Sequence, residues 1–304
     1  MQQLIEQNDF VLMEAAIVEP IRRAAEVALH PTLVNAPLIY SEKGRQALAK
    51  QYQAYIDVAS AAKLPIILCA PTWRANQERV EASEFNRNIN ADAIQFVRKI
   101  KDNQVTNISG IKVGGMIACK NDCYKPEEAL SIQEAAEFHA WQINHLSESG
   151  ADYIMAATIP AVSEAIGIAK AMAATKTPYI ISFVIDRTGS VLDGSTLSEA
   201  IAAVDEAVTR KPLGYMVNCS YPSFLCVEQQ PSSLFKRLIG FQGNASSLDH
   251  CDLDNADQLE VNQLSEWGQE MVKLNQSFGI KILGGCCGTG KEHLKLLVDH
   301  IKGT

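Results

Sequence analysis

The chain has 304 residues, of which 27 are Lys or Arg and 35 are Asp or Glu, so its formal charge is −8. Nucleic acids and anionic membranes bind basic surfaces, so this acidic balance argues against either of them as the main partner. Hydrophobic residues make up 47% of the chain and charged residues 20%, which is typical of a globular protein.

The first ten residues, MQQLIEQNDF, have neither a basic flank nor a continuous apolar core, so we expect no secretory signal. No stretch approaches the roughly 18 to 20 apolar residues that a membrane-spanning helix needs. We therefore expect a cytoplasmic protein without a membrane partner. Disulfides are rare in that compartment, and clustered cysteines there more often bind a metal or take part in catalysis.

Short apolar runs alternate with longer amphipathic segments along the whole chain. A continuous apolar run is typical of a strand that is covered on both faces, as in a parallel sheet. The runs that we expect to form strands cover residues 10–13, 65–70, 108–118, 153–157, 178–184, 213–217, 238–241 and 280–283.

The segments between these runs show the features of helices. Residues 42–63 have apolar side chains at helical spacing and no interior proline. Ser131 with Glu134, and Thr196 with Glu199, have the spacing of a capping box, in which two side chains satisfy backbone N–H groups at the start of a helix. We expect helices over 42–63, 85–101 and 131–149, from 196 to about 210, and from about 163, 231, 258 and 290.

Eight strands that each precede a helix predict an α/β protein with the (β/α)8 TIM-barrel fold. No low-complexity linker or change of composition divides the sequence, so we expect one domain over residues 1–304. Active sites of such barrels lie at the carboxyl ends of the strands, so we expect the functional residues of this chain there.

Three of the eight cysteines follow expected strands in a suggestive way. Cys286 and Cys287 lie in the glycine-rich segment Leu283-Gly-Gly-Cys-Cys-Gly-Thr289 after the eighth strand, and Cys219 follows the sixth. Three thiolates that leave one position open suit a catalytic Zn²⁺. The alternative is that they are small buried residues, the usual situation of a free cysteine. We expect that situation for Cys69, Cys119, Cys226 and Cys251, and we expect Cys123 to be a reduced residue without a role.

The pair Asn218-Cys219, followed by Gly284-Gly-Cys-Cys-Gly-Thr289, resembles the zinc-dependent homocysteine S-methyltransferase family. The resemblance continues through residues 139–152, 158–160, 181–183 and 192–197, and so covers the chain from about residue 57 to its end. It implies a (β/α)8 barrel in which Cys219, Cys286 and Cys287 hold zinc.

The resemblance also implies a reaction, in which a methyl group passes from a small donor to the thiol of homocysteine and gives methionine. A zinc ion with three thiolates carries a formal charge of −1 and is suited to hold a fourth thiol as its thiolate. We expect the barrel to take up all 304 residues without a cobalamin or folate module, which implies a sulfonium or ammonium donor such as S-methylmethionine, S-adenosylmethionine or betaine. The expected partners are thus a small-molecule thiol acceptor and a methyl donor.

Two positions depart from the family pattern. The family has Asp-Gly after its first strand and a glutamate just before the threonine of its Thr-Ile-Pro segment, and the resemblance implies that both carboxylates hold the amino group of homocysteine. This chain has Glu14-Ala15 and Ala157 at these positions. A substrate ammonium facing one carboxylate rather than two loses a charge-assisted hydrogen bond. Either the longer Glu14 compensates, or the acceptor is another thiol, or Glu14 is a solvated or ion-paired loop residue.

Two further residues are candidate substrate contacts. Trp73 occupies the position of a family aromatic and could bind a cationic donor on its face, although structural packing is the alternative. Asn218 either positions substrate or is a turn residue with a satisfied amide.

Three functions remain open at this point. They are methyl transfer to homocysteine, the same chemistry with another thiol, and a zinc-binding barrel without turnover. The sequence identifies neither the donor nor an interface, so a homo-oligomer is also left open.

Overall fold

A computed structural model describes residues 1–85, 88–104, 110–247 and 264–303 of the chain. Eight parallel strands close into a barrel in chain order, with the first strand paired to both the second and the eighth. The strands are β1 (Val11–Met13), β2 (Ile66–Cys69), β3 (Ile111–Ala118), β4 (Tyr153–Ile159), β5 (Tyr179–Phe183), β6 (Gly214–Ser220), β7 (Leu238–Gly243) and β8 (Ile282–Gly285). The predicted TIM-barrel fold is confirmed.

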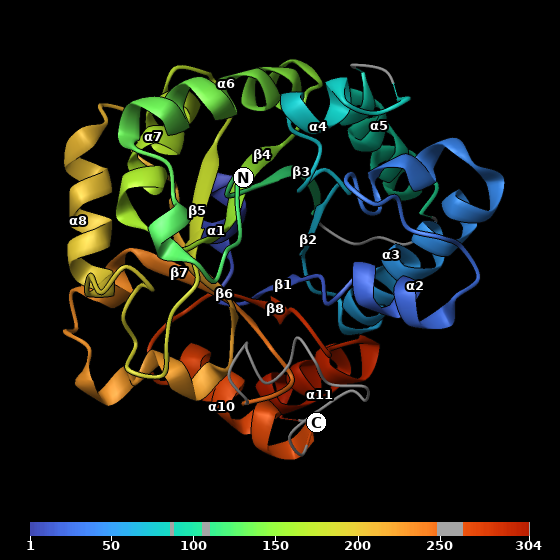
Figure 1. The fold of residues 1–304 in the computed structure, drawn as a ribbon. Coiled ribbons are helices and arrows are strands. Elements are labelled where there is room, and N and C mark those ends of the chain that lie inside the picture. The colour runs from blue at the N-terminus through green and yellow to red at the C-terminus, as the bar shows by residue number, and fades with distance from the viewer. Residues whose placement is uncertain (86–87, 105–109, 248–263, 304) are drawn as a thin grey trace.

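A ring of helices surrounds the barrel (Figure 1). These helices are α2 (Val18–Ala24), α3 (Glu42–Ala62), α4 (Gln77–Glu81), α5 (Ile89–Asp102), α6 (Ile132–Glu148), α7 (Val162–Ala173), α8 (Leu197–Ala207), α10 (Leu264–Gln276) and α11 (Lys291–Lys302). The face of α3 that the apolar spacing predicted, which includes Leu48, Tyr52 and Ile56, is buried against the strands. Within the described residues, no helix combines the length and the apolar character needed to cross a bilayer.

Side chains fill the interior of the barrel, and a short helix covers one end of it. Side chains from several strands, among them Met13, Ile67 and Met155, form one interior cluster. Leu4 and Ile5 of the short helix α1 (Gln2–Gln7) pack against this cluster. The sequence analysis did not foresee α1, which Figure 1 shows close to the barrel axis. The opposite end, where the strands finish, carries Cys219 and the turn with Cys286 and Cys287.

Both predicted capping boxes are formed. In the first, the Ser131 hydroxyl accepts a hydrogen bond from the backbone N–H of Glu134, whose carboxylate accepts one from the backbone of Ser131. Thr196 and Glu199 repeat this arrangement at the start of α8. A capping box depends only on residues three apart, so it can be read from sequence alone.

The helix predicted from residue 231 is wrong. Between β6 and β7 the chain forms only three short 3-10 turns, η3 (Pro222–Leu225), η4 (Val227–Gln229) and η5 (Leu234–Lys236). β7 begins at Leu238, so a helix starting at 231 would have room for only about two turns, and the single turn η5 forms there instead.

Some predicted boundaries fall outside the described residues. Position 258, where the helix before the eighth strand is predicted to start, is one of them. Residues 86–87 of the predicted helix 85–101, residues 108–109 of the predicted third strand, and Cys251 also lie outside the described residues. The sixth strand is longer than predicted, because β6 continues through Asn218 and Cys219 to Ser220.

Candidate metal and substrate site

Three cysteines from distant parts of the sequence meet at the carboxyl end of the barrel. The Sγ atoms of Cys219 in β6 and of Cys286 and Cys287 after β8 all lie within 4.8 Å of one another. The Sγ atoms of Cys219 and Cys286 are 2.7 Å apart. Cys219 is buried and Cys287 is exposed, so the cluster opens to solvent on one side. The predicted convergence is confirmed, whereas the role of these residues as zinc ligands stays a prediction.

The turn after β8 is built so that only glycine fits beside the cysteines. The N–H of Cys286 donates to the carbonyl of Gly243, and the Thr289 hydroxyl donates back to the carbonyl of Cys286 at 2.6 Å. A Cβ atom on Gly285 would lie 2.1 Å from Thr289 Oγ1, and Gly288 has φ +78°. Glycine therefore permits the tight turn that aims both thiols at Cys219.

Cys219 is aimed by an irregularity in its own strand. Its φ is +54°, and the pairing of β6 with β7 shifts register between Asn218 and Ser220. An irregularity of this kind redirects a side chain at the end of a strand. Non-glycine residues rarely adopt positive φ, and they do so where the surrounding structure enforces it.

The side-chain amide of Asn218 stabilises this irregular region by accepting hydrogen bonds from its neighbours. Its Oδ1 accepts hydrogen bonds from the N–H of Thr158 at 2.9 Å and from the Ser182 hydroxyl at 2.6 Å. Thr158 also has φ +54°, at the point where the pairing of β4 with β5 shifts. The side chain of Asn218 thus joins three strands beneath the site, which agrees with the satisfied-amide interpretation. A contact with substrate stays a prediction.

The electrostatics of the cluster favour a bound cation. Hydrogen bonding with Cys286 and Cys287, together with burial, raises the pKa of Cys219 well above its usual range. The pKa of Cys286 is raised as well, so a metal ion bound here would have to displace the protons of these two thiols. A set of three sulfur ligands is typical of soft or borderline metals, zinc among them.

Asn244, which the sequence analysis missed, adds an unsatisfied acceptor to the same region. It directly follows β7, and its N–H donates to the carbonyl of Ser220, next to Cys219. The N–H of the following residue, Ala245, donates to the carbonyl of Cys287. Asn244 is only 3% exposed, and among the described residues its Oδ1 has no hydrogen-bond partner. Buried acceptors are normally satisfied, so this atom suits a region that takes up a cation or a hydrogen-bond donor.

Tyr124 is a second residue that the sequence analysis missed. It lies in the loop between β3 and α6. Burial is the main cause that raises its pKa well above the usual range of a phenol, and the nearby thiols of Cys219 and Cys287 raise it further. The neighbouring Cys123, expected to have no role, belongs to the same surroundings. Burial raises the pKa of its thiol to about 11, and Cys287 contributes to that increase. Nothing local in the sequence places this loop near the cysteines.

Glu14 lies buried at the base of the site. Its carboxylate accepts a hydrogen bond from the N–H of Cys69 at 2.9 Å, and its carbonyl accepts one from the N–H of Gly285. Its exposure is 4%, so its interpretation as a solvated loop carboxylate is wrong. Burial raises the pKa of Glu14 to about 8, although the hydrogen bond from Cys69 opposes this increase. The backbone of Glu14 is hydrogen-bonded to the turn that carries Cys286, and the contact of its carboxyl group with substrate stays a prediction.

Trp73 is half-buried and already has a cation on one face. The guanidinium carbon of Arg74 lies 4.4 Å from the centre of the indole ring. The same guanidinium donates to the carbonyls of Cys119 and Asn121, so it braces the loop after β3. A donor cation would therefore have to use the other face of Trp73, and this contact also stays a prediction.

Comparison with known proteins agrees with the fold and the site. The homocysteine S-methyltransferase family model matches residues 4–301. Homocysteine S-methyltransferase YbgG of Bacillus subtilis is 21% identical over 97% of this chain and 95% of its own length. Homocysteine S-methyltransferase 2 of Arabidopsis thaliana is 26% identical over 53% of this chain, a stretch that spans only 49% of the plant protein.

Among solved structures, the metallated form of the homocysteine methyltransferase MmuM from Escherichia coli has the same fold. Its TM-score is 0.75 over 98% of both chains, at 16% sequence identity. The barrel and the family match together define a methyltransferase, which argues against a barrel without turnover. The chain belongs to the homocysteine S-methyltransferase family.

Proposed function

We propose that this chain transfers a methyl group from a small sulfonium or ammonium donor to the thiol of homocysteine, giving methionine. The observation that carries the proposal is the convergence of Cys219, Cys286 and Cys287 at the mouth of the barrel. These residues would hold Zn²⁺, which when bound supplies the Lewis acidity that keeps an acceptor thiol deprotonated at neutral pH.

The chain's own residues would then bind and orient the two substrates. S-methylmethionine, S-adenosylmethionine and betaine are the candidate donors, because each carries its methyl group on a positive sulfur or nitrogen. Tyr124 and the open face of Trp73 are the aromatic surfaces proposed to contact such a cation. Alignment of the donor methyl with the acceptor sulfur would supply much of the rate enhancement.

Glu14 is the proposed partner of the acceptor's amino group. It is buried beside Gly285, within the same wall of the barrel as the cysteine turn. An ammonium group placed against this carboxyl would favour its charged form and so lower its raised pKa. Because β4 presents Ala157 rather than a carboxylate, Glu14 would make this contact alone.

The specificity of the acceptor can be tested with Glu14→Gln, which preserves the size of the side chain but removes its charge. We expect kcat/KM for homocysteine to fall about 10- to 100-fold, the loss of a hydrogen bond between charged groups. Transfer to 3-mercaptopropanoate, a thiol without an amino group, should change little and serves as the control.

An equal loss with both thiols would contradict an amino-group contact at Glu14. A wild-type preference for thiols without an amino group would instead favour the second candidate function, which is the same chemistry with another acceptor. The replacement of a family carboxylate by Ala157 is the observation that favours this second candidate.

The proposed ligands can be tested by metal analysis of purified protein. We expect about one zinc per chain and its loss in Cys287→Ala, because removal of one ligand leaves an incomplete three-sulfur site. Cys226→Ser is the matched control, since Cys226 is half-buried but lies outside the cluster. A full complement of zinc in Cys287→Ala would contradict the assignment.

We further propose that residues 1–304 act as one catalytic unit on small molecules in the cytoplasm. Assembly into a homo-oligomer is left to measurement.

A further inference from the structure

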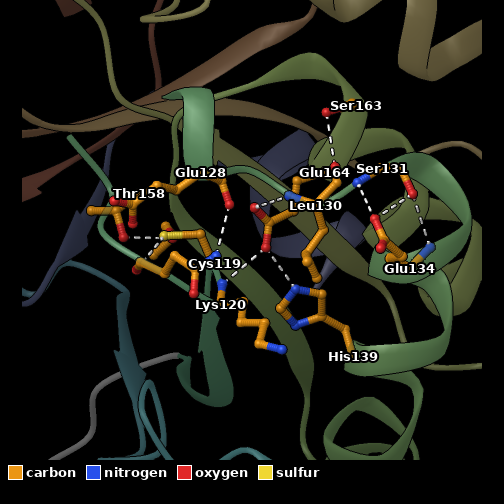
Figure 2. Close-up of polar contacts among 12 residues, drawn as sticks. Cys119, Lys120, Glu128, Leu130, Ser131, Glu134, His139, Thr158, Ser163 and Glu164 are labelled. Atoms are coloured by element: carbon orange, nitrogen blue, oxygen red, sulfur yellow. Dashed lines mark hydrogen bonds and ion pairs between the residues drawn. The ribbon is translucent and has the colours of Figure 1, made fainter. Parts of the chain in front are cut away.

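The loop that joins β3 to α6, residues 119–131, approaches the cysteine cluster and is here called the β3–α6 loop. It carries Cys123 and Tyr124, and the nearby thiol of Cys287 contributes to the raised pKa of both side chains. Figure 2 shows that both ends of this loop converge on Glu164, a residue of α7. Glu164 is remote from the metal-site cysteines in sequence and is absent from the proposed mechanism.

A single buried carboxylate closes the loop. Oε1 of Glu164 accepts a hydrogen bond from the N–H of Lys120 at 2.9 Å, near the start of the loop. Oε2 accepts one from the N–H of Leu130 at 3.4 Å, near its end. The hydroxyl of Ser163 also donates to the carbonyl of Leu130 at 2.9 Å. The first residues of α7 thus hold the two ends of the loop together.

His139 of α6 fixes the orientation of this carboxylate. Its Nε2 lies 3.0 Å from Oε1 of Glu164, and the two side chains are 0% and 1% exposed. Among the described residues, Nδ1 of His139 is buried without a hydrogen-bond partner. The tautomer that carries hydrogen on Nε2 donates to Glu164 and leaves Nδ1 as an acceptor, which avoids an orphaned buried N–H group.

The loop is also braced internally and from β2. The side-chain amide of Asn121 donates to the carbonyl of Glu128 at 2.7 Å, across the loop. Arg74 donates to the carbonyls of Cys119 and Asn121 from the segment after β2. With both ends fixed, the segment that contains Tyr124 has little freedom to move away from the cysteines.

We propose that Glu164, oriented by His139, is a positioning residue that holds the β3–α6 loop across the mouth of the barrel and places Tyr124 beside the substrates. The catalytic part of this proposal rests on the proposed function, because Glu164 acts only through the loop. The structural part stands on the hydrogen bonds of Glu164 alone.

Hydrogen exchange tests the structural part without any need for activity. Glu164→Gln keeps the shape of the side chain but replaces one carboxylate oxygen by an NH₂ group. This donor would face the N–H groups of Lys120 or Leu130, which are donors themselves. We expect amides within residues 119–131 to exchange at least 10-fold faster in this variant, in the metal-free and the zinc-loaded protein alike. Unchanged protection would overturn the proposal.

Glu134→Gln is the matched control. Glu134 lies in the first turn of α6, directly after the loop, where it is exposed and, within the described part of the chain, bonds with Ser131 in the capping box. We expect its exchange to change at the start of α6 and not at Lys120. Equal effects of the two substitutions on Lys120 would show that Glu164 has no special role.

Kinetics test the catalytic part. We expect Glu164→Gln to raise KM for the methyl donor at least 5-fold while the zinc content stays at about one per chain. The same substitution made in a Tyr124→Ala background should have less than a 2-fold further effect, since the residue that the loop positions is already absent. A fall of kcat in proportion to lost folded protein, with KM unchanged, would overturn positioning and leave only a structural role.

His139→Gln keeps the proposal falsifiable if Glu164→Gln folds poorly. Gln retains an N–H donor for Glu164, so we expect KM within 2-fold of wild type, whereas His139→Ala should raise it at least 5-fold. Identical behaviour of the two variants would contradict the role of His139. If the unsubstituted zinc-loaded chain transfers no methyl group, the proposed function and the catalytic part fail together, and hydrogen exchange alone decides the structural part.

Discussion

At the scale of single residues, the site depends on side chains that satisfy strained backbone. Asn218 is the clearest case, because its Oδ1 accepts from the backbone of Thr158 and from Ser182 at a point where the pairings of β4 with β5 and of β6 with β7 are irregular. Without this acceptor, the N–H of Thr158 would be buried and unpaired.

We therefore expect Asn218→Ala to lower the free energy of unfolding by about 1–3 kcal/mol, the cost of a buried unsatisfied donor. Ser182→Ala should cost less, since the Thr158 bond to Asn218 remains. Urea denaturation of the three proteins measures the difference. Equal stability of Asn218→Ala and wild type would contradict the role given to this amide.

The buried carboxyl group of Glu14 makes the stability of the whole protein depend on pH. Burial raises its pKa from 4.5 to about 8, so the folded protein holds a proton that the unfolded chain releases over this range. The stability that depends on the protonated carboxyl is present below about pH 4.5 and is lost as pH rises toward 8.

We expect wild type to lose stability relative to Glu14→Gln by about 1.4 kcal/mol per pH unit across this window. Urea titrations of the reduced, metal-free proteins at several pH values between 5.5 and 7.5 give the comparison. Parallel stability curves for the two proteins would rule out a raised pKa at Glu14.

At the scale of elements, the turn after β8 can place the thiols of Cys286 and Cys287 only because Gly285 has no side chain that would collide with Thr289. We expect Gly285→Ala to force Thr289 away from the Cys286 carbonyl, to cost about 1–3 kcal/mol and to weaken zinc binding at least 10-fold. Gly290→Ala is the matched control, because nothing lies within 4 Å of a Cβ atom there. Chelator competition with each variant measures zinc affinity. Similar affinities for the two would show that the close contact at Gly285 is unimportant.

Some of these elements could be predicted from the sequence, and others could not. Ser131, Thr196 and the apolar face of α3 depend on residues a few positions apart, and their predictions are confirmed. The irregularity at Cys219 and the closeness of Tyr124 to the thiols depend on contacts between distant segments. No local pattern encodes them. The helix predicted from 231 is absent because β7 begins at Leu238, and the short segment before it forms only the turn η5.

At the scale of the whole molecule, closure of the barrel is what assembles the site. Glu14 after β1, Cys219 in β6 and Cys286 after β8 are far apart in sequence, and the pairing of β1 with β8 brings the first and last of them together. The predicted fold therefore also predicted the meeting place of the cysteines, since strand ends share one mouth. The orientation of Glu14 toward Cys69 required the structure.

The central claim is that a zinc-bearing barrel methylates the thiol of homocysteine. The most direct measurement incubates the zinc-loaded chain with homocysteine and each of S-methylmethionine, S-adenosylmethionine and betaine, and quantifies methionine and zinc in the same sample. We expect methionine from at least one donor at about one zinc per chain, and none from Cys287→Ala under identical conditions. Zinc-loaded protein that forms no methionine from any of these donors, or an equally active Cys287→Ala variant, would contradict the account.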